Sequence, residues 1–212
     1  MSVDFKNYHS VRGKLNNSNC DLMVVSKNRT IEDIESLLKK NHFLFGENRV
    51  QEAKSKFSSL RFKYNFDLHL IGPLQSNKTE EALQLFDCIQ TLDRKKIIDQ
   101  IITIENKKKI NLRTKSFFLQ INIGQEKQKS GIDINEISKV YKYCTDRNLS
   151  IKGIMCIPPN KLDASKFFKD MVLIKNQLNP KLNLSMGMSN DYELALKFNS
   201  NILRIGSLFF YD

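Results

Sequence analysis

The sequence predicts a single-domain α/β protein folded as a (β/α)8 barrel, that is, a TIM barrel. Short apolar runs rich in β-branched residues alternate with stretches whose apolar residues recur at helical spacing. Such alternation is typical of βαβ units and a parallel sheet. Eight apolar runs in 212 residues match the strand count of the barrel, although an open, doubly wound sheet is also compatible with it.

The expected elements follow one another without a linker or a low-complexity segment. Residues 163–178 carry an apolar stripe at helical spacing. The eight expected strands cover residues 22–26, 43–46, 67–71, 88–92, 116–123, 150–157, 182–186 and 201–205. Polar residues spaced three apart, as at helix N-termini, precede three helical stretches: Thr30 and Asp33, Asp133 and Glu136, and Asn190 and Glu193.

The two ends of the chain are expected to complete the barrel together. Only residues 207–212 follow the last strand, and they are too few for a full eighth helix. A helix within residues 2–15 is able to cover the gap that remains. We therefore expect one domain over residues 1–212, with a leading helix in 1–18 and the barrel in 20–212.

The chain is strongly basic, with 34 Lys and Arg against 23 Asp and Glu, which gives a net charge of +11. The lysines are spread over every expected helix and mixed with acidic residues, so we interpret them as solvated helix faces. The cluster Lys107–Lys109 indicates a helix C-terminus. A nucleic-acid-binding interpretation rests on charge alone, since no recognition helix or aromatic platform is evident.

Composition excludes several other classes of protein. No run approaches the ~18 apolar residues of a membrane span, and the N-terminus lacks the apolar core of a secretory signal, so we expect a cytoplasmic protein without a membrane partner. Four widely spaced cysteines do not form a disulfide framework. Three scattered histidines lack metal-ligand spacing, and we expect no metal.

In a TIM barrel, function is expected at the C-terminal ends of the strands. Lys27 follows the apolar run that ends the first strand. We expect a lysine there to be partly desolvated, which favours the neutral amine that attacks carbonyl carbons. The alternative is a lysine that simply extends into solvent.

The loops after the seventh and eighth strands form the usual phosphate site of such barrels. Here they carry Ser189 next to a helix start, together with Gly206 and Ser207. Backbone N–H groups at a helix start and a residue without Cβ allow a phosphate to approach closely. Gly206 could equally be a plain strand-ending turn. A Schiff-base lysine opposite a phosphate site fits pyridoxal 5'-phosphate (PLP).

Several motifs in the order of the chain identify a family. The sequence resembles the pyridoxal phosphate homeostasis protein family (YggS/PROSC type) and is similar to the N-terminal barrel of alanine racemase. The resemblance spans about residues 20–210. The matching segments are residues 22–27 (LMVVSK), 45–52 (FGENRVQE), 69–78 (HLIGPLQSNK), 120–123 with 129–131, 152–155 (KGIM), 184–189 (LSMGMS) and 204–206 (RIG).

The resemblance implies a single-domain PLP-binding TIM barrel of the alanine-racemase-like kind (fold type III). It implies that Lys27 forms a Schiff base with PLP and that Arg204 faces the pyridine nitrogen. It further implies a phosphate site and a cofactor lining, with Asn122 nearby. The residues implied to bind the phosphate of PLP are Ser189, Gly206 and Ser207, and those implied to line the cofactor are Asn48 and Met155.

Three positions depart from the usual family pattern. Arg49 stands where the family commonly has Tyr, Leu68 where it has an aromatic residue, and Pro159 where it often has a small residue. None of them removes an implied cofactor contact. His69 is interpreted as a packed strand residue.

The expected function is to hold PLP for homeostasis, without a dedicated catalytic reaction. The alternative is a small PLP-dependent amino-acid racemase or lyase. The chain ends just after the last strand, and the second domain that brings a tyrosine acid/base in alanine racemases is not expected. We expect a monomer, with PLP-dependent apo-enzymes as possible acceptors of the cofactor.

Overall fold

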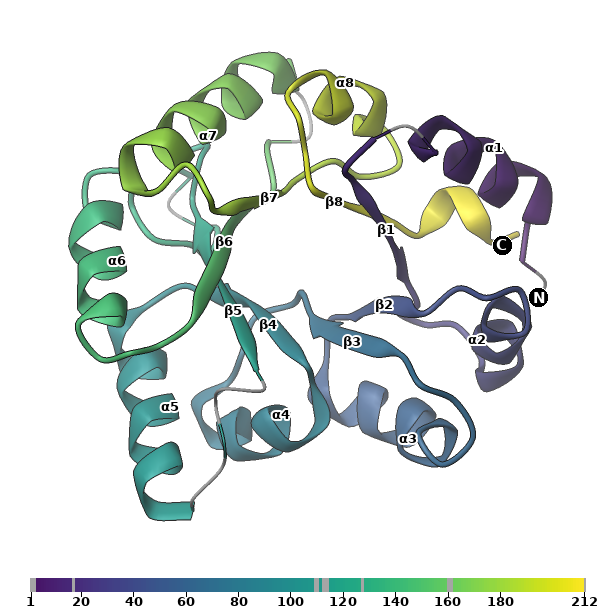
Figure 1. The fold of residues 1–212 in the computed structure, drawn as a ribbon, viewed down its shortest axis with the longest axis horizontal. Helices are drawn as coiled ribbons and strands as arrows, with labels where there is room; N and C mark the ends of the chain where they lie inside the picture. The colour runs from purple at the N-terminus through teal and green to yellow at the C-terminus, as the bar shows by residue number, and fades with distance from the viewer. Residues whose placement is uncertain are drawn as a thin grey trace.

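The computed structural model describes residues 3–16, 18–108, 111, 115–126, 128–159 and 162–211. Eight parallel strands form a closed barrel in the order β1 to β8, with the helices outside it (Figure 1). This confirms the predicted TIM barrel, and each strand lies within two residues of its expected bounds. The strands are β1 (Asp21–Val25), β2 (Leu44–Glu47), β3 (Asp67–Leu70), β4 (Cys88–Leu92), β5 (Ser116–Ile121), β6 (Ile151–Cys156), β7 (Asn183–Ser185) and β8 (Ile202–Ile205).

The helices form a ring around the barrel. None of the described helices has the length and apolar character needed to cross a membrane. They are α1 (Phe5–Leu15), α2 (Ile31–Leu38), α3 (Val50–Leu60), α4 (Thr79–Leu85), α5 (Lys95–Lys108), α6 (Ile137–Thr145), α7 (Ala164–Leu178) and α8 (Tyr192–Lys197), with short 3-10 turns η1 (Ser76–Lys78) and η3 (Ser207–Phe209). Helix α5 ends where the lysine cluster predicts, although Lys109 lies outside the described residues.

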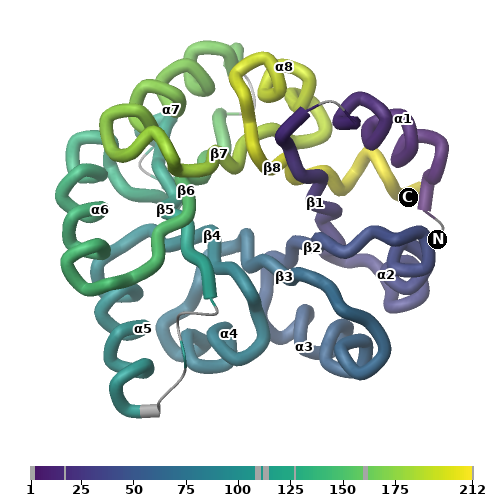
Figure 2. The backbone as a smooth tube through the Cα atoms, viewed as in Figure 1, coloured from purple at the N-terminus to yellow at the C-terminus, as the bar shows by residue number. Residues whose placement is uncertain are grey.

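The N-terminal helix completes the ring where the C-terminal segment is short, as the sequence predicts. Val3 forms an antiparallel bridge with Phe210, and the Asp4 backbone N–H donates to the Phe209 carbonyl at 2.7 Å. The Tyr8 ring packs edge-on against Phe209, with 5.6 Å between the ring centroids. The two ends of the chain therefore lie together beside β1 (Figure 2).

Two apolar layers hold the barrel. The larger lies between the strands and the helices, where residues such as Phe45 and Phe57 are fully buried. The smaller lies inside the barrel and consists of Met23, Ile71, Cys88, Phe118, Met155 and Ile202. A glycine at position 153 is needed there, because a Cβ would overlap the Phe118 ring and a backbone oxygen of β7.

The helix starts agree only partly with the sequence. Thr30 and Asp33 form the predicted capping box of α2. Helix α6, in contrast, has its N-cap at Glu136, three residues after the predicted Asp133, because the Asp133 carboxylate accepts from the Asn135 N–H at 2.8 Å and forms a local turn. Helix α8 begins at Tyr192, and Asp191 rather than Asn190 precedes it.

The capping box of α2 yields a stability prediction. The Thr30 hydroxyl accepts from the Asp33 N–H at 3.2 Å, and the Asp33 carboxylate accepts from the Thr30 N–H at 3.2 Å. Thr30→Ala should lower the free energy of unfolding by about 1 kcal/mol, because the helix start loses an acceptor. Thr103→Ala, inside α5, is the control, since that hydroxyl only donates to a carbonyl within the helix. If urea unfolding showed equal losses of unfolding free energy in the two variants, the role of Thr30 as the N-cap of α2 would be contradicted.

A buried histidine connects α1 to β2. His42 is 7% exposed; its Nδ1 pairs with the Tyr8 hydroxyl at 3.1 Å and its Nε2 with the Leu44 carbonyl at 2.7 Å. Burial lowers the pKa of His42 from 6.5 to about 4, because the charged ring is poorly solvated there. The unfolded chain therefore binds this proton more readily than the folded chain does.

Acid should consequently weaken the fold through His42. Its contribution is complete above the unfolded pKa of 6.5 and is lost as the pH falls toward 4. The loss amounts to at most about 3 kcal/mol. Urea unfolding at about pH 7 and about pH 4.5 should show a smaller decrease in stability for His42→Gln than for the wild type. The prediction is wrong if both proteins lose the same amount.

Candidate functional site

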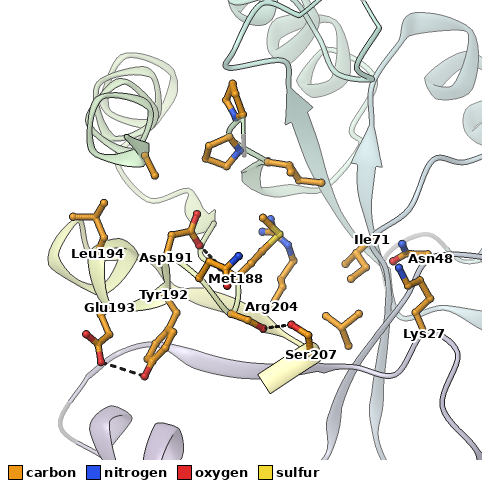
Figure 3. A pocket seen from close by; sticks show the side chains of 18 of the residues that line it. Lys27, Asn48, Ile71, Met188, Asp191, Tyr192, Glu193, Leu194, Arg204 and Ser207 are labelled. Atoms are coloured by element: carbon orange, nitrogen blue, oxygen red, sulfur yellow. Dashed lines mark hydrogen bonds between the residues drawn. The ribbon is translucent and has the colours of Figure 1, made fainter. Parts of the chain in front are cut away.

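A cavity of about 1100 Å³ opens at the C-terminal end of the barrel, where function is expected in this fold (Figure 3). Its walls come from the ends of β1, β2, β3, β6, β7 and β8. Six of the seven residues predicted to bind a cofactor line it: Lys27, Asn48, Ser189, Arg204, Gly206 and Ser207. Barrel closure therefore brings the predicted amine and the predicted phosphate site into one cavity.

Met155 is the exception, and the structure does not place it in the cavity wall. Its side chain is fully buried inside the barrel, in the smaller apolar cluster. Ile71 belongs to that cluster and does line the cavity. Met155 thus packs against the cavity wall from inside the barrel. Asn122, expected nearby, binds the Glu126 backbone instead.

Lys27 stands on a backbone that is fixed on both sides. Ser26, before it, accepts from the Lys56 ammonium through its carbonyl at 2.7 Å and donates its hydroxyl to Glu47 at 2.8 Å. The Asn28 N–H, after it, donates to the Glu52 carboxylate at 2.5 Å. The Lys27 side chain itself is exposed at the barrel mouth. The residue is exposed, so the structure does not show the partial desolvation predicted for this lysine.

The anchor behind Lys27 is a buried ionic cluster. Lys56 contacts Glu47 at 2.9 Å and Glu52 at 2.6 Å, and Glu47 is fully buried. Burial raises the pKa of Glu47, while the Lys56 ammonium opposes that shift. Removing one partner of such a cluster leaves an uncompensated buried charge. The cluster thus makes the position of the Lys27 backbone hard to change.

Asn48 owes its position to a close approach between two loops. A Cβ on Gly72 would overlap the backbone of Asn48, so only glycine allows the end of β3 to pass there. The Gly72 carbonyl also accepts from the Thr91 hydroxyl at 2.8 Å. Asn48 and Lys27 lie on the same side of the cavity, opposite Met188 and Asp191 (Figure 3).

The hydroxyls predicted to bind phosphate meet at the end of the barrel. Ser207, after β8, donates to the Ser189 hydroxyl, after β7, at 3.0 Å. A Cβ on Gly206 would lie 3.1 Å from both Cβ and O of Val25, so glycine permits tight contact with β1. The turn before Ser189 needs Gly187, whose φ is +96°. The Asp191 carboxylate closes that turn by accepting from the Met188 N–H at 2.6 Å.

Arg204 reaches the cavity from inside the barrel and is almost fully buried, with 4% exposure. Its guanidinium donates to the Cys156 carbonyl and to the Ser185 hydroxyl, both at 2.8 Å. Burial lowers its pKa from the usual value. Guanidinium nevertheless stays protonated in proteins, so Arg204 presents fixed N–H donors and a positive charge to the cavity.

His69 is a packed strand residue, as the sequence predicts, and does not line the cavity. Its Nδ1 accepts from the Gln90 side-chain amide at 2.9 Å. Burial lowers the pKa of His69 to about 4. The ring is therefore neutral at ordinary pH and contacts no reacting group directly.

One of the three family departures lies in the cavity wall. Pro159 lines it, and a Cβ on Gly124 would lie 2.6 Å from the Pro159 ring, so the small residue at 124 accommodates the proline. Leu68 is fully buried between the strands and the helices. Arg49 is exposed and immediately precedes α3.

Sequence reasoning missed four polar residues behind the site, namely Glu47, Lys56, Gln90 and Ser185. One signal was available for two of them. Gln90 and Ser185 are polar residues within expected strands, and a polar side chain buried in a strand needs a hydrogen-bond partner. No signal pointed to Lys56, because a helical lysine usually faces solvent.

No protein-family model matches the chain. Among curated proteins, it is 35% identical over 206 residues to the pyridoxal phosphate homeostasis protein of Haemophilus influenzae, covering 92% of this chain and 86% of the relative. The protein of the same name from Pasteurella multocida is 37% identical over 202 residues, covering 89% and 84%.

Solved structures show the same relationship. PipY of Synechococcus elongatus without PLP has a TM-score of 0.88 at 28% identity, covering 97% of this chain and 98% of that chain. PipY with PLP bound has a TM-score of 0.83 at 28% identity, covering 96% and 97%. Alanine racemase of Acinetobacter baumannii shares the fold alone, with a TM-score of 0.75 and 16% identity, covering 98% of this chain and 61% of that chain. With more than 30% identity along most of its length to these curated relatives, the chain belongs to the pyridoxal phosphate homeostasis protein family.

Proposed function

We propose that the chain binds PLP in the cavity at the barrel mouth, holds it covalently on Lys27 and serves PLP homeostasis without a dedicated reaction. One observation carries the proposal. A cavity amine, a fixed guanidinium and two paired hydroxyls line one cavity, through Lys27, Arg204, Ser189 and Ser207. The names of the curated relatives and the PLP-bound PipY support it.

The donor set fits the chemical groups of PLP. The cofactor is an aldehyde with a phosphate and a pyridine nitrogen, and each group has a counterpart in the cavity. The Lys27 amine suits the aldehyde, the hydroxyls of Ser189 and Ser207 suit the phosphate, and Arg204 suits the ring nitrogen. The missing Cβ of Gly206 keeps the end of β8 close to Val25 beside these hydroxyls.

Covalent capture requires the neutral amine of Lys27. Its nitrogen attacks the aldehyde carbon, a C=N bond forms, and the aldehyde oxygen leaves as water. Water reverses the reaction by hydrolysis, and a second amine reverses it by exchange, which returns the lysine amine. Because Lys27 is exposed at the mouth, both reagents can reach it. The covalent link is therefore suited to reversible holding.

Arg204 makes the site suitable for holding rather than for carbanion chemistry. When bound, PLP supplies an electron sink whose strength depends on protonation of its ring nitrogen. A guanidinium donates to that nitrogen and gives up no proton, so it favours the unprotonated and weaker sink. The residue therefore contributes to binding and orientation while limiting activation of an amino-acid substrate.

The alternative function, a PLP-dependent racemase or lyase, needs a second acid/base opposite Lys27. Tyr192 lines the cavity, but its hydroxyl accepts from Lys14 at 3.2 Å and donates to Glu193 at 3.2 Å. Asp191 is engaged with the Met188 N–H. These contacts favour the holding function. The acceptor apo-enzymes, the monomeric state and the cytoplasmic location stay predictions.

Lys27 is tested against Lys197, a second exposed lysine that lines the same cavity. Purified wild-type protein with PLP should show the visible band of a lysine-bound cofactor, and borohydride should fix the cofactor on the Lys27 peptide. Lys27→Ala should lose both signals, because the attacking amine is gone. Lys197→Ala should keep them. A band that survives in Lys27→Ala, or a reduced adduct on Lys197, would refute the assignment.

The absence of a dedicated reaction is tested by hydrogen exchange at the α-carbon. A panel of amino acids is incubated in D2O with the PLP-loaded protein, and loss of the α-proton signal is followed by NMR. Exchange should not exceed that with free PLP at equal concentration, because Arg204 favours the weak sink. Fast exchange with one amino acid alone would establish the enzyme alternative.

A further inference from the structure

A chain of hydrogen bonds runs through the barrel interior behind Arg204. The Arg204 guanidinium donates to the Ser185 hydroxyl at 2.8 Å, and that hydroxyl donates to the Gln90 carbonyl oxygen at 2.6 Å. The Gln90 amide nitrogen then donates to Nδ1 of His69 at 2.9 Å. The four residues come from β8, β7, β4 and β3, so the chain crosses the barrel.

The hydrogen bonds from Arg204 to His69 have a fixed donor-to-acceptor direction. The Gln90 amide nitrogen, which can only donate, faces His69, so His69 Nδ1 is the acceptor, and the Gln90 oxygen faces Ser185. The Ser185 hydroxyl therefore donates its hydrogen bond to Gln90, and the Ser185 oxygen accepts from Arg204. Together with the Cys156 carbonyl, this oxygen holds the guanidinium at two points on two different strands. Rotation of the guanidinium would break at least one buried, charge-assisted bond.

Neither Ser185 nor Gln90 lines the cavity, and both are fully buried. Any effect on a ligand must therefore pass through Arg204. Resting on the proposed function, we propose that Ser185 and Gln90 are positioning residues that aim the Arg204 guanidinium at the pyridine nitrogen of PLP. They determine how firmly that nitrogen is kept unprotonated, and so the electronic state of the bound cofactor.

A nearby serine provides the matched control. Ser200 is also buried, with 3% exposure, and among the described residues its hydroxyl bonds to backbone carbonyls alone, those of Leu184, Met186 and Ile202. Ser200→Ala therefore removes a buried hydroxyl from the same part of the barrel without touching Arg204. Any general loosening of β7 and β8 should appear in both variants. A change in the cofactor itself should appear only in Ser185→Ala.

The experiment compares wild type, Ser185→Ala and Ser200→Ala after loading with PLP. In Ser185→Ala, borohydride should still fix PLP on Lys27, the dissociation constant should rise about tenfold, and the visible band should shift in position and pH dependence. Ser200→Ala should keep the wild-type band, whatever its melting temperature. Identical bands in all three proteins would overturn the inference. Failure of the wild type to bind PLP would instead overturn the proposed function.

A double-mutant cycle separates positioning from a merely structural role. If Ser185 acts through Arg204, then Ser185→Ala should cause no further band shift in an Arg204→Gln background. Additive shifts would contradict the inference. Should Ser185→Ala fail to fold, Gln90→Met tests the same chain, and Gln120→Met on β5 is its control. Gln120 is likewise buried and donates to the Ser130 carbonyl, which takes no part in the hydrogen bonds behind Arg204.

Discussion

Closure of the barrel by β8 against β1 is the contact on which the site depends. The two strands pair in parallel, with Met23 opposite Arg204 and Val24 opposite Ile205. Parallel pairing places both C-terminal ends at the same rim, so the loop with Lys27 lies beside Gly206 and Ser207. In a doubly wound open sheet the first strand is internal and the last lies at an edge, so the two would not pair. Helix α1 then protects the closure from outside, through the contacts of Val3, Asp4 and Tyr8 with the C-terminal segment.

Two buried polar networks support two basic residues of the cavity, Lys27 and Arg204, and they do so differently. Behind Lys27, the Glu47–Lys56–Glu52 cluster fixes the backbone on either side and leaves the side chain exposed. Behind Arg204, the Ser185–Gln90–His69 chain fixes the side chain itself. A group that captures and releases an aldehyde benefits from freedom of movement, whereas a group that recognises one ring nitrogen benefits from rigidity. Each network suits the role proposed for the residue it supports.

The sequence predicts the features that local pattern determines. Strand positions and the cavity residues Lys27, Ser189 and Ser207 follow from apolar runs and from the fold-level rule about strand ends. Met155 could not be placed, because its depth inside the barrel depends on the register that sets it opposite Gln120 and Ser185. The start of α6 was missed because Asp133 suits both a cap and an isolated turn. The exposure of Lys27 depends on which loops cover the mouth, and those contacts are non-local.

The arrangement of charge supports the proposal that this barrel holds PLP without turning over a substrate. A racemase or lyase must stabilise a carbanion and move a proton at a second position. Here the described acidic and phenolic groups of the cavity wall are committed elsewhere: Asp191 to a turn, and Glu193 and Tyr192 to Lys14 on α1. Those contacts connect α8 to the N-terminal helix, so a proton-transfer role would require these groups to leave their present partners. The fold and a second acid/base would therefore compete for Asp191, Tyr192 and Glu193, and in this structure the contacts of the fold engage them.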